Sequence, residues 1–302
     1  MKRASVCDPV PSRRLVHYTP LRYPGGKGKL TSYIKSVIEM NALVDGTYVE
    51  PYAGGAAIAL ELLFHEYVSQ IHINDISRSV YAFWKSVLDH TEDFVRLIRN
   101  TRLSVRTWDK QKQIFAHAKD YDDLELGFAT FFLNRTNRSG ILNGGIIGGR
   151  DQSGPWKIGA RFNAPELIFR VESIAKLSSR IRLSRKDAIA FLSSKLNVWP
   201  EKTLIYLDPP YYAKGKDLYY DFYTHEDHER IAEFVTGTID RQKWIVSYDN
   251  VKEIRKMYAG YRKVVYGLNY SARKSRLGAE TMFFNEGLQI PERTGAMRVL
   301  VA

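Results

Sequence analysis

The sequence predicts an α/β fold built on a parallel, doubly wound sheet. Apolar runs of strand length alternate with stretches of helical periodicity along most of the 302 residues, which is typical of a parallel sheet covered by helices. A Gly-rich turn joins the first predicted strand to a helix, as in a β-turn-α unit. No internal repeat or low-complexity tract is visible, so solenoid and disordered classes are excluded.

The predicted elements follow one another in regular order. The first strand, residues 47–49, leads through Gly54 and Gly55 into an Ala- and Leu-rich helix at residues 56–64. Each later strand is a short segment with consecutive or alternating apolar residues, and each later helix carries apolar residues at helical spacing. The later strands are expected at residues 70–75, 180–184, 204–207 and 244–247, and the later helices at residues 80–88, from 188 through 192, and at about 225–234.

Residues 91–163 interrupt this order. Their first half is helical in pattern, whereas residues 134–163 are rich in Gly, Asn and Arg with few apolar positions. Long loops in compact domains are usually functional. We therefore expect an inserted subdomain at 91–163 that ends in a long loop or hairpin, a main domain formed by 21–90 and 164–302, and a short leader at 1–20.

The charge balance predicts a polyanionic partner. The formal net charge is +12 and the pI is near 9.5, and Lys and Arg bind phosphates with release of counterions. Solvated helix faces are the alternative explanation. The basic residues gather in two clusters, one with Arg170, Lys176, Arg180, Arg182, Arg185 and Lys186, the other with Arg262, Lys263, Arg273, Lys274 and Arg276.

Cysteine and hydropathy patterns predict a cytosolic protein. The single cysteine, Cys7, excludes a disulfide framework and a Cys-based zinc site. The N-terminal segment has no apolar signal region, and no run approaches the ~20 apolar residues that span a membrane. We expect the chain to work in the cytoplasm without a membrane.

A stiff acidic loop follows the strand at 204–207. Pro209 and Pro210 fix φ and donate no backbone hydrogen bond, so they end the strand and present Asp208 and Tyr211 on a rigid loop. The Asp208 carboxylate and the Pro209 carbonyl can accept the hydrogens of an exocyclic amino group, and the Tyr211 ring can stack on a flat base. A strand followed by an ordinary rigid turn is the alternative.

Two Gly-containing motifs precede this loop. Tyr23-Pro24-Gly25-Gly26-Lys27 lies at the start of a predicted helix, where the backbone can approach a ligand and Lys27 can reach an anionic group; an ordinary Gly-rich helix start is the alternative. The turn after the first strand, Glu50-Pro51-Tyr52-Ala53-Gly54-Gly55, suits a nucleoside-type cofactor. Neither has the spacing of a P-loop or a dinucleotide-binding fingerprint.

Taken in order, the three motifs resemble those of the Dam-like, D12 class (α-group) DNA adenine N6-methyltransferases. The resemblance extends from Leu21 to Phe284, and the combination is far more specific than any one motif. Asn74-Asp75 resembles the acidic position after the second strand of the family, and Asp187 resembles the one after the third. Ala56 stands where the family often has a third Gly, and we expect cofactor binding to survive this departure.

The resemblance implies methyl transfer from S-adenosylmethionine to N6 of an adenine flipped out of duplex DNA. It implies a Rossmann-like S-adenosylmethionine-dependent methyltransferase sheet with an inserted helical or hairpin DNA-recognition subdomain. The implied catalytic residues are Asp208, Pro209, Pro210 and Tyr211. The implied cofactor residues are Tyr23, Gly25, Gly26 and Lys27 at the methionine end, Glu50, Pro51 and Gly54 along the pocket, Asp75 at the ribose, Asp187 near the adenine ring, and Asp208.

The same resemblance places DNA contacts in the insert. Arg and Asn side chains there can serve phosphates or read base edges, and the equal alternative is that Asn134 and Arg135 brace the loop. The reaction needs no metal, and we interpret His225 and His228 as a solvated helix face rather than a ligand pair. The implied DNA-binding residues are Asn134, Arg135, Asn137, Arg138, Arg150 and Lys157.

Other functions stay open at this point. An adenine methyltransferase acting on RNA and a cytosine N4-methyltransferase share the pocket logic, although Asp208 favours adenine. A protein-glutamine methyltransferase is expected to carry Asn there, and a binding protein without catalysis is expected to have lost Lys27, Asp75 or Asp208. We expect a monomer or weak dimer associated with the nucleoid, with a cognate restriction enzyme as a further partner to test; the recognition sequence of a relative is not transferred.

Overall fold

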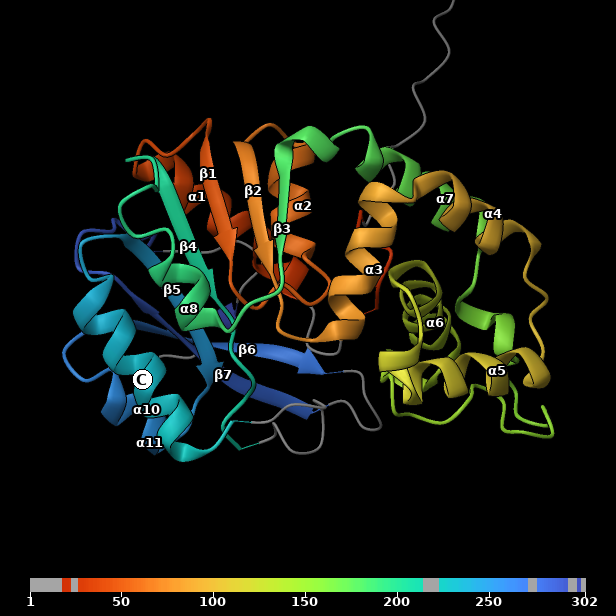
Figure 1. Cartoon of the computed structure of the whole chain (residues 1–302). Helices are drawn as coiled ribbons and strands as arrows, with labels where there is room; N and C mark the ends of the chain where they lie inside the picture. The colour runs from red at the N-terminus through yellow and green to blue at the C-terminus, as the bar shows by residue number, and fades with distance from the viewer. Residues whose placement is uncertain (1–17, 23–26, 214–222, 271–275, 293–297, 300–302) are drawn as a thin grey trace, which may run out of the picture.

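The computed structural model describes residues 18–22, 27–213, 223–270, 276–292 and 298–299. One sheet forms the centre of the molecule, with the strand order β3-β2-β1-β4-β5-β7-β6-β8, and helices lie on both of its faces (Figure 1). The strands are β1 (Gly46–Glu50), β2 (Val68–Asn74), β3 (Ile181–Ser184), β4 (Thr203–Leu207), β5 (Lys243–Asp249), β6 (Arg262–Tyr270), β7 (Arg276–Phe284) and β8 (Arg298–Val299).

The sheet is mixed rather than wholly parallel. The strands β3, β2, β1, β4 and β5 run parallel, and all five correspond to predicted strands. Strand β7 pairs antiparallel with β5, and β6 pairs antiparallel with β7 and β8. The α/β prediction is confirmed, but the all-parallel sheet was wrong. Basic residues at the start of both hairpin strands, such as Arg262 and Arg276, hide the apolar alternation that marks a strand.

The strand order reverses between β1 and β4. From β1 the chain passes outward to β2 and β3, and it then returns to form β4 on the other side of β1. In open α/β sheets the crevice beyond such a switch point is the usual place for a ligand. Glu50 at the end of β1 and Asp208 just after β4 both lie at this point.

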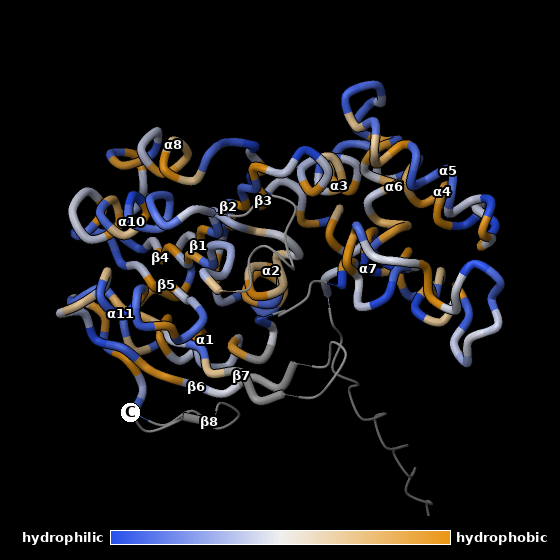
Figure 2. Tube along the Cα trace, turned by 90° about the horizontal axis from the view of Figure 1, so that it is seen from below, coloured by the Kyte–Doolittle hydropathy of each residue, from blue (hydrophilic) through white to orange (hydrophobic). Residues whose placement is uncertain are grey.

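Alternate residues of the central strands feed two hydrophobic cores. Leu204 and Tyr206 of β4 pack into a core shared with helices α1 (Thr31–Met40) and α2 (Ala57–Phe64). Ile205 and Leu207 face the opposite core, which is covered by α8 (Ala188–Ser193), α10 (His225–Glu233) and α11 (Lys252–Met257). Figure 2 shows the apolar residues concentrated along β4, β5 and α2. A strand buried on both faces explains the continuous apolar run before Asp208.

The helices of residues 91–175 stand beside the sheet, beyond β3 and next to α3 (Arg78–Asp89) (Figure 1). Helix α6 (Asp123–Thr136) crosses α3 closely at Gly127, where an added Cβ would lie 2.2 Å from the Ser86 Oγ and 2.5 Å from the Ala82 carbonyl oxygen. The Phe83 and Phe131 rings stack at this crossing. The other α-helices of the group are α4 (Thr91–Asn100), α5 (Val105–Ala116) and α7 (Ala164–Ala175).

The segment between α6 and α7 is a loop rather than a regular hairpin. Within it the described residues form a single isolated bridge, Asn137 to Ile146, and two short 3-10 turns, Arg138–Gly140 and Ile158–Arg161. Of the two forms predicted for this segment, the long loop is the one present. Among the described residues, no helix combines the length and apolar character needed to cross a membrane.

Candidate active site

The buried Asn74 side chain links the carboxyl ends of β1, β2 and β3 by hydrogen bonds. Its Nδ2 donates to the carbonyl oxygens of Pro51 (3.0 Å) and Lys186 (2.9 Å). Its Oδ1 accepts from the Ser184 Oγ (2.8 Å) and the Lys186 backbone N–H (3.0 Å). A fully satisfied buried amide fixes its neighbours, so the loops after β1, β2 and β3 have defined positions.

Asp75, the next residue, orders the Gly-rich turn. One carboxylate oxygen accepts from the Gly54 backbone N–H (2.9 Å), and the other accepts from the Ser77 N–H (3.0 Å). Gly54 has a φ of 46°, and Ala56 also has a φ of 46°. The left-handed conformation at Ala56 explains why glycine suits this position, since a Cβ adds strain there.

Glu50 is buried beneath the same turn. Its Oε1 accepts from the Ala59 N–H (3.2 Å) near the start of α2. Burial raises the pKa of Glu50 to about 8. At neutral pH this side chain is therefore mainly a neutral acid, so it does not place a full negative charge at the predicted cofactor pocket. Asp187 differs: it is exposed and accepts from the Ala190 N–H (3.1 Å) as the N-cap of α8.

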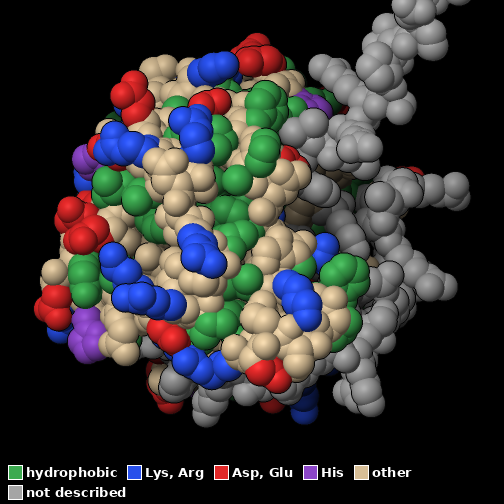
Figure 3. Space-filling model, turned by 90° about the vertical axis from the view of Figure 1, so that its right-hand side faces the viewer, with side chains coloured by type: hydrophobic (Ala, Val, Ile, Leu, Met, Phe, Trp, Pro, Cys, Tyr) green, Lys and Arg blue, Asp and Glu red, His purple; other side chains and the backbone are tan. Residues whose placement is uncertain are grey.

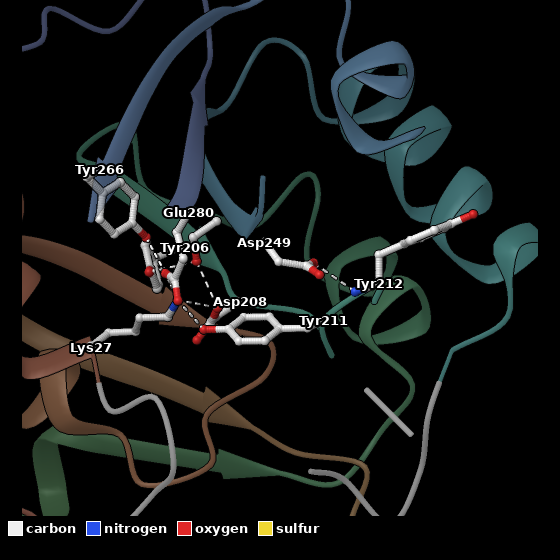
Figure 4. A network of polar contacts seen from close by, with 9 residues as sticks. Lys27, Tyr206, Asp208, Tyr211, Tyr212, Asp249, Tyr266 and Glu280 are labelled. Carbon is white, nitrogen blue, oxygen red and sulfur yellow. Dashed lines mark hydrogen bonds and ion pairs between the residues drawn. The ribbon is translucent and has the colours of Figure 1, made fainter. Parts of the chain in front are cut away.

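A buried polar network surrounds Asp208 (Figure 4). The Lys27 Nζ lies 3.3 Å from the Asp208 Oδ1 and 2.5 Å from the Glu280 Oε2, and it donates to the Tyr211 hydroxyl at 3.0 Å. The Asp208 Oδ1 also accepts from the Ser247 Oγ at 2.8 Å. The residues come from four separate parts of the chain, which meet at the carboxyl end of β4.

Charges within this network support one another. Burial by itself would lower the pKa of Lys27, but the carboxylates of Asp208 and Glu280 and the nearby tyrosines raise that pKa well above its usual value. Burial raises the pKa of Asp208, and the Lys27 ammonium opposes this shift. The structure therefore holds an ammonium ion between two carboxyl groups, where each ion lowers the cost of burying the others.

The Tyr211 side chain takes part in the network instead of lying open. Its ring is buried, and its hydroxyl donates to the Glu280 Oε1 at 2.5 Å. The Lys27 Nζ lies 5.0 Å from the ring centroid. The predicted stacking of Tyr211 on a base requires the ring face to be uncovered when a ligand enters.

Asp249 braces the loop that follows Tyr211. Its two carboxylate oxygens accept from the backbone N–H groups of Tyr212 and Ala213, both at 2.9 Å. His228 supports the same region from inside: its Nδ1 is 3.1 Å from the Tyr248 hydroxyl, and burial lowers its pKa to about 4. The interpretation of His228 as part of a solvated face was wrong, because α10 turns this residue toward the sheet.

Comparisons with known proteins decide the family. The model of the D12 class N6 adenine-specific DNA methyltransferases matches residues 23–271. The chain belongs to this family. It is similar to the type II methyltransferase M.CviBI of Paramecium bursaria Chlorella virus NC1A, with 24% identity over 275 residues that cover 86% of this chain and 94% of the relative. It is also similar to the type II methyltransferase M.MjaIII of Methanocaldococcus jannaschii, with 22% identity over 271 residues that cover 81% and 90%.

The protein is thus a DNA adenine N6-methyltransferase with the α/β fold of S-adenosylmethionine-dependent methyltransferases. Among solved structures, protein LPL1258 of Legionella pneumophila is 11% identical with a TM-score of 0.32, covering 86% of this chain and 85% of that chain. That likeness is too low to add to the assignment. In the described part of the methyltransferase, no group of three or more His, Cys, Asp or Glu side chains is arranged to hold a metal ion.

Two residues of the methyltransferase that were predicted to contact DNA, Asn134 and Asn137, are buried and hold the loop in place by hydrogen bonds. The Asn134 Oδ1 accepts from the Arg22 N–H (2.7 Å), and its Nδ2 donates to the carbonyl oxygens of Arg22 and Gly140, both at 2.9 Å. Asn137 is also fully buried; its Oδ1 accepts from the Trp108 Nε1 at 2.7 Å. For both amides the structure corrects the DNA assignment, because their hydrogen-bonding groups are used inside the protein.

The four basic candidates differ in their surroundings. Arg135 is half-buried and donates to the carbonyl oxygens of Arg161 (2.8 Å) and Pro20 (3.4 Å); burial and neighbouring arginines lower its pKa to about 9. Arg138, Arg150 and Lys157 are exposed. Figure 3 shows the side of the molecule on which the helices of residues 91–175 lie; basic side chains there are spread among apolar and acidic ones.

Sequence reasoning missed Glu280 and Tyr266. Glu280 lies on β7 and is paired in register with Tyr266 of β6, whose hydroxyl donates to the Glu280 Oε2 at 2.7 Å. The available signal was a lone carboxylate just before Thr281 and the apolar run 282–284. The predicted residues Tyr23, Gly25 and Gly26 lie outside the described residues.

Proposed function

We propose that the methyltransferase uses S-adenosylmethionine to methylate N6 of an adenine flipped out of duplex DNA, with Asp208 as the acceptor of the target amino group. The observation that carries this proposal is the position of Asp208. Its carboxylate follows the buried strand β4 at the switch point of the sheet. It lies on a loop stiffened by two prolines and forms an ion pair with the Lys27 ammonium.

The residues beside the Gly-rich turn fit the proposed cofactor. The Gly54 backbone bends into the left-handed region, which leaves room for a nucleoside against the chain. Asp75 and Asp187 follow β2 and β3, where carboxylates can accept hydrogen bonds from ribose hydroxyls and an adenine amino group. Glu50 and Pro51 line the base of the pocket. When bound, S-adenosylmethionine supplies a methyl group on a good leaving group.

Lys27 has a different proposed role from the one predicted. Its side chain is 6% exposed and its ammonium contacts two carboxyl groups, so it is already paired and does not extend as a separate cation toward the cofactor. We assign Lys27 to balancing the charge of Asp208. The backbone of the preceding Gly25 and Gly26 keeps its proposed place at the methionine end.

The chain's own chemistry is orientation and charge stabilisation. The Asp208 carboxylate and the Pro209 carbonyl accept the two N6 hydrogens, which turns the nitrogen lone pair toward the methyl group. Nitrogen would gain positive charge as the C–N bond forms and the bond between the methyl carbon and sulfur breaks; Asp208 would stabilise this charge and then take the proton that N6 loses. Tyr211 stacks on the flipped base once its ring face is uncovered.

We assign DNA recognition to residues 91–163. We propose that the exposed side chains of Arg138 and Lys157 contact phosphates, and that Arg150 joins them when it exchanges Asp109 for DNA. The side chains of Asn134 and Asn137 shape the loop on which these cations stand. We propose that the enzyme acts in the cytoplasm as a monomer or weak dimer.

The test is methylation of genomic DNA in vivo. The wild type and Asp208→Ala are expressed in a host without DNA methylation, and modified bases are read by single-molecule sequencing. We expect N6-methyladenine in one short motif for the wild type and none for Asp208→Ala, although the variant still binds S-adenosylmethionine in a thermal-shift assay. The exposed carboxylate variant Glu201→Ala, outside residues 91–163, is the matched control and should methylate normally. Full methylation by Asp208→Ala would refute the role of Asp208.

A further inference from the structure

We infer that Glu280 is a positioning residue for methyl transfer: as the closest counter-ion of Lys27, it keeps the Asp208 carboxylate available for the target amino group. The inference rests on the proposed role of Asp208. Glu280 lies 72 positions after Asp208 in the sequence (280 − 208), and β7 brings the two into one network. Figure 4 shows Glu280 above Lys27 and Asp208.

Glu280 receives three hydrogen bonds from three different elements. Its Oε2 accepts from the Lys27 Nζ at 2.5 Å and from the Tyr266 hydroxyl at 2.7 Å. Its Oε1 accepts from the Tyr211 hydroxyl at 2.5 Å. A carboxylate that receives three donors is held in one orientation. Glu280 therefore fixes both the ammonium of Lys27 and the side chain of Tyr211 before any substrate enters.

The two carboxylates share Lys27 unequally. The Lys27 Nζ is 2.5 Å from Glu280 but 3.3 Å from Asp208, so its shorter contact is with Glu280. Exposure follows the same order, because the side chain of Glu280 is 1% exposed, that of Lys27 is 6% exposed and that of Asp208 is 24% exposed. The innermost carboxylate takes the ammonium, and the outermost one faces the space where a base must enter.

Loss of the negative charge at position 280 would change how the Lys27 ammonium is shared between the two side chains. With Asp208 as the single anion near the ammonium, Lys27 would shift toward Asp208 because the two opposite charges lie in a buried site. The ammonium hydrogens would then compete with the adenine amino group for the Asp208 oxygens. The Asp208 Oδ1 already accepts from Ser247 at 2.8 Å, so a closer ammonium would fill the remaining site on that oxygen and leave only the Oδ2 for the substrate.

The pH dependence gives a readout that a purely structural role would not produce. Asp208 must be ionised to accept the amino hydrogens, and the negative charge of Glu280 raises the pKa of Asp208 while Lys27 lowers it. Removal of the Glu280 charge lowers that pKa, so the acid limb of activity should move to lower pH. The titratable groups around Asp208 and its partners are Lys27, Tyr48, Glu50, Tyr206, Tyr211, Tyr248, Tyr266 and Glu280.

The experiment compares Glu280→Gln with Glu280→Asp. Glutamine keeps the size and can turn its amide oxygen toward Lys27 and Tyr266, whereas aspartate keeps the charge. We expect Glu280→Gln to lower kcat/KM on unmethylated genomic DNA about 10- to 100-fold, with its acid limb at lower pH and cofactor affinity unchanged. Glu280→Asp should lose less activity and keep the wild-type acid limb. The exposed Glu286→Gln is the matched control and should behave as wild type.

The outcomes separate this inference from the proposed function. Wild-type kcat/KM for Glu280→Gln, or a loss of activity without movement of the acid limb, would overturn the role of Glu280. Methylation by Asp208→Ala would instead overturn the role of Asp208. If Glu280→Gln does not fold, Tyr266→Phe removes one donor to Glu280 and leaves its charge: a loss of about 2- to 5-fold in kcat supports the inference, and an unchanged kcat refutes it.

Discussion

Gly140→Ala is expected to move the loop between α6 and α7 away from Arg22. Gly140 has a φ of 76°, and an added Cβ would lie 2.4 Å from the Arg22 carbonyl oxygen and 3.0 Å from the Arg22 Cβ. The first contact is between a Cβ, whose position is fixed by the backbone of residue 140, and a backbone oxygen, so neither atom can turn away as a flexible side chain would. The loop must move from Arg22 for alanine to fit.

The cost of this change has two parts. Alanine in the left-handed region costs about 1–2 kcal/mol. Movement of the loop also breaks the hydrogen bond that the Asn134 Nδ2, on helix α6, donates to the Gly140 carbonyl oxygen; such a bond contributes about 0.5–1.5 kcal/mol. The sum is a loss of about 1.5–3.5 kcal/mol in the free energy of unfolding. For a chain of this size that is a fall of roughly 2–6 °C in Tm.

Gly145→Ala supplies a control in the same loop. No atom lies within 4 Å of the Cβ position at Gly145, and its φ is not positive. Its stability should stay the same or rise by up to about 1 kcal/mol, because alanine restricts the unfolded chain. Urea unfolding followed by tryptophan fluorescence measures both variants. Equal stability of the two variants would refute the argument that Gly140 is required by its contact with Arg22.

Two further predictions test the charge assignments. Glu50→Gln should flatten the dependence of stability on pH: the folded-state pKa of about 8 lies above the ordinary value of 4.5, so the contribution of protonated Glu50 to stability is fully present below pH 4.5 and is lost as pH rises through 8, a loss that the variant lacks in urea unfolding. Arg138→Ala should weaken DNA binding and lower, by about 1, the slope of the logarithm of the binding constant against the logarithm of salt concentration. Arg135→Ala should chiefly lower Tm. Equal slopes for Arg138→Ala and wild type would contradict the phosphate role of Arg138.

Local patterns were enough to predict the parallel half of the fold. The runs before Glu50 and Asp208 are apolar because β1 and β4 are buried on both faces, and Gly54 is required by a left-handed turn. The hairpin of β6 and β7 was not predicted, because its strands mix charged and apolar residues and its pairing partners are set by the topology of the whole sheet.

The assignment of Asn134 and Asn137 shows a second limit. Asn in a Gly- and Arg-rich loop can equally read DNA bases or satisfy backbone groups, and the residue type does not distinguish the two. The deciding fact is burial. Asn134 ends up against Arg22, 112 positions earlier, and Asn137 against Trp108. Such long-range contacts depend on how the insert docks on the main domain.

The register of the sheet explains why the site needs its antiparallel strands. Across neighbouring strands, Asp249 of β5 is paired with Glu280 of β7, and Glu280 is paired with Tyr266 of β6. Residues paired across adjacent strands point to the same face, so Asp249, Glu280 and Tyr266 form one polar row. One end of this row braces the loop after Tyr211, and its middle holds Lys27 against Asp208. A shift of β7 by one residue would turn Glu280 to the other face and leave the Lys27 ammonium with Asp208 as its main counter-ion. The pairing of β7 with β5 is therefore part of the proposed catalytic arrangement as well as of the fold.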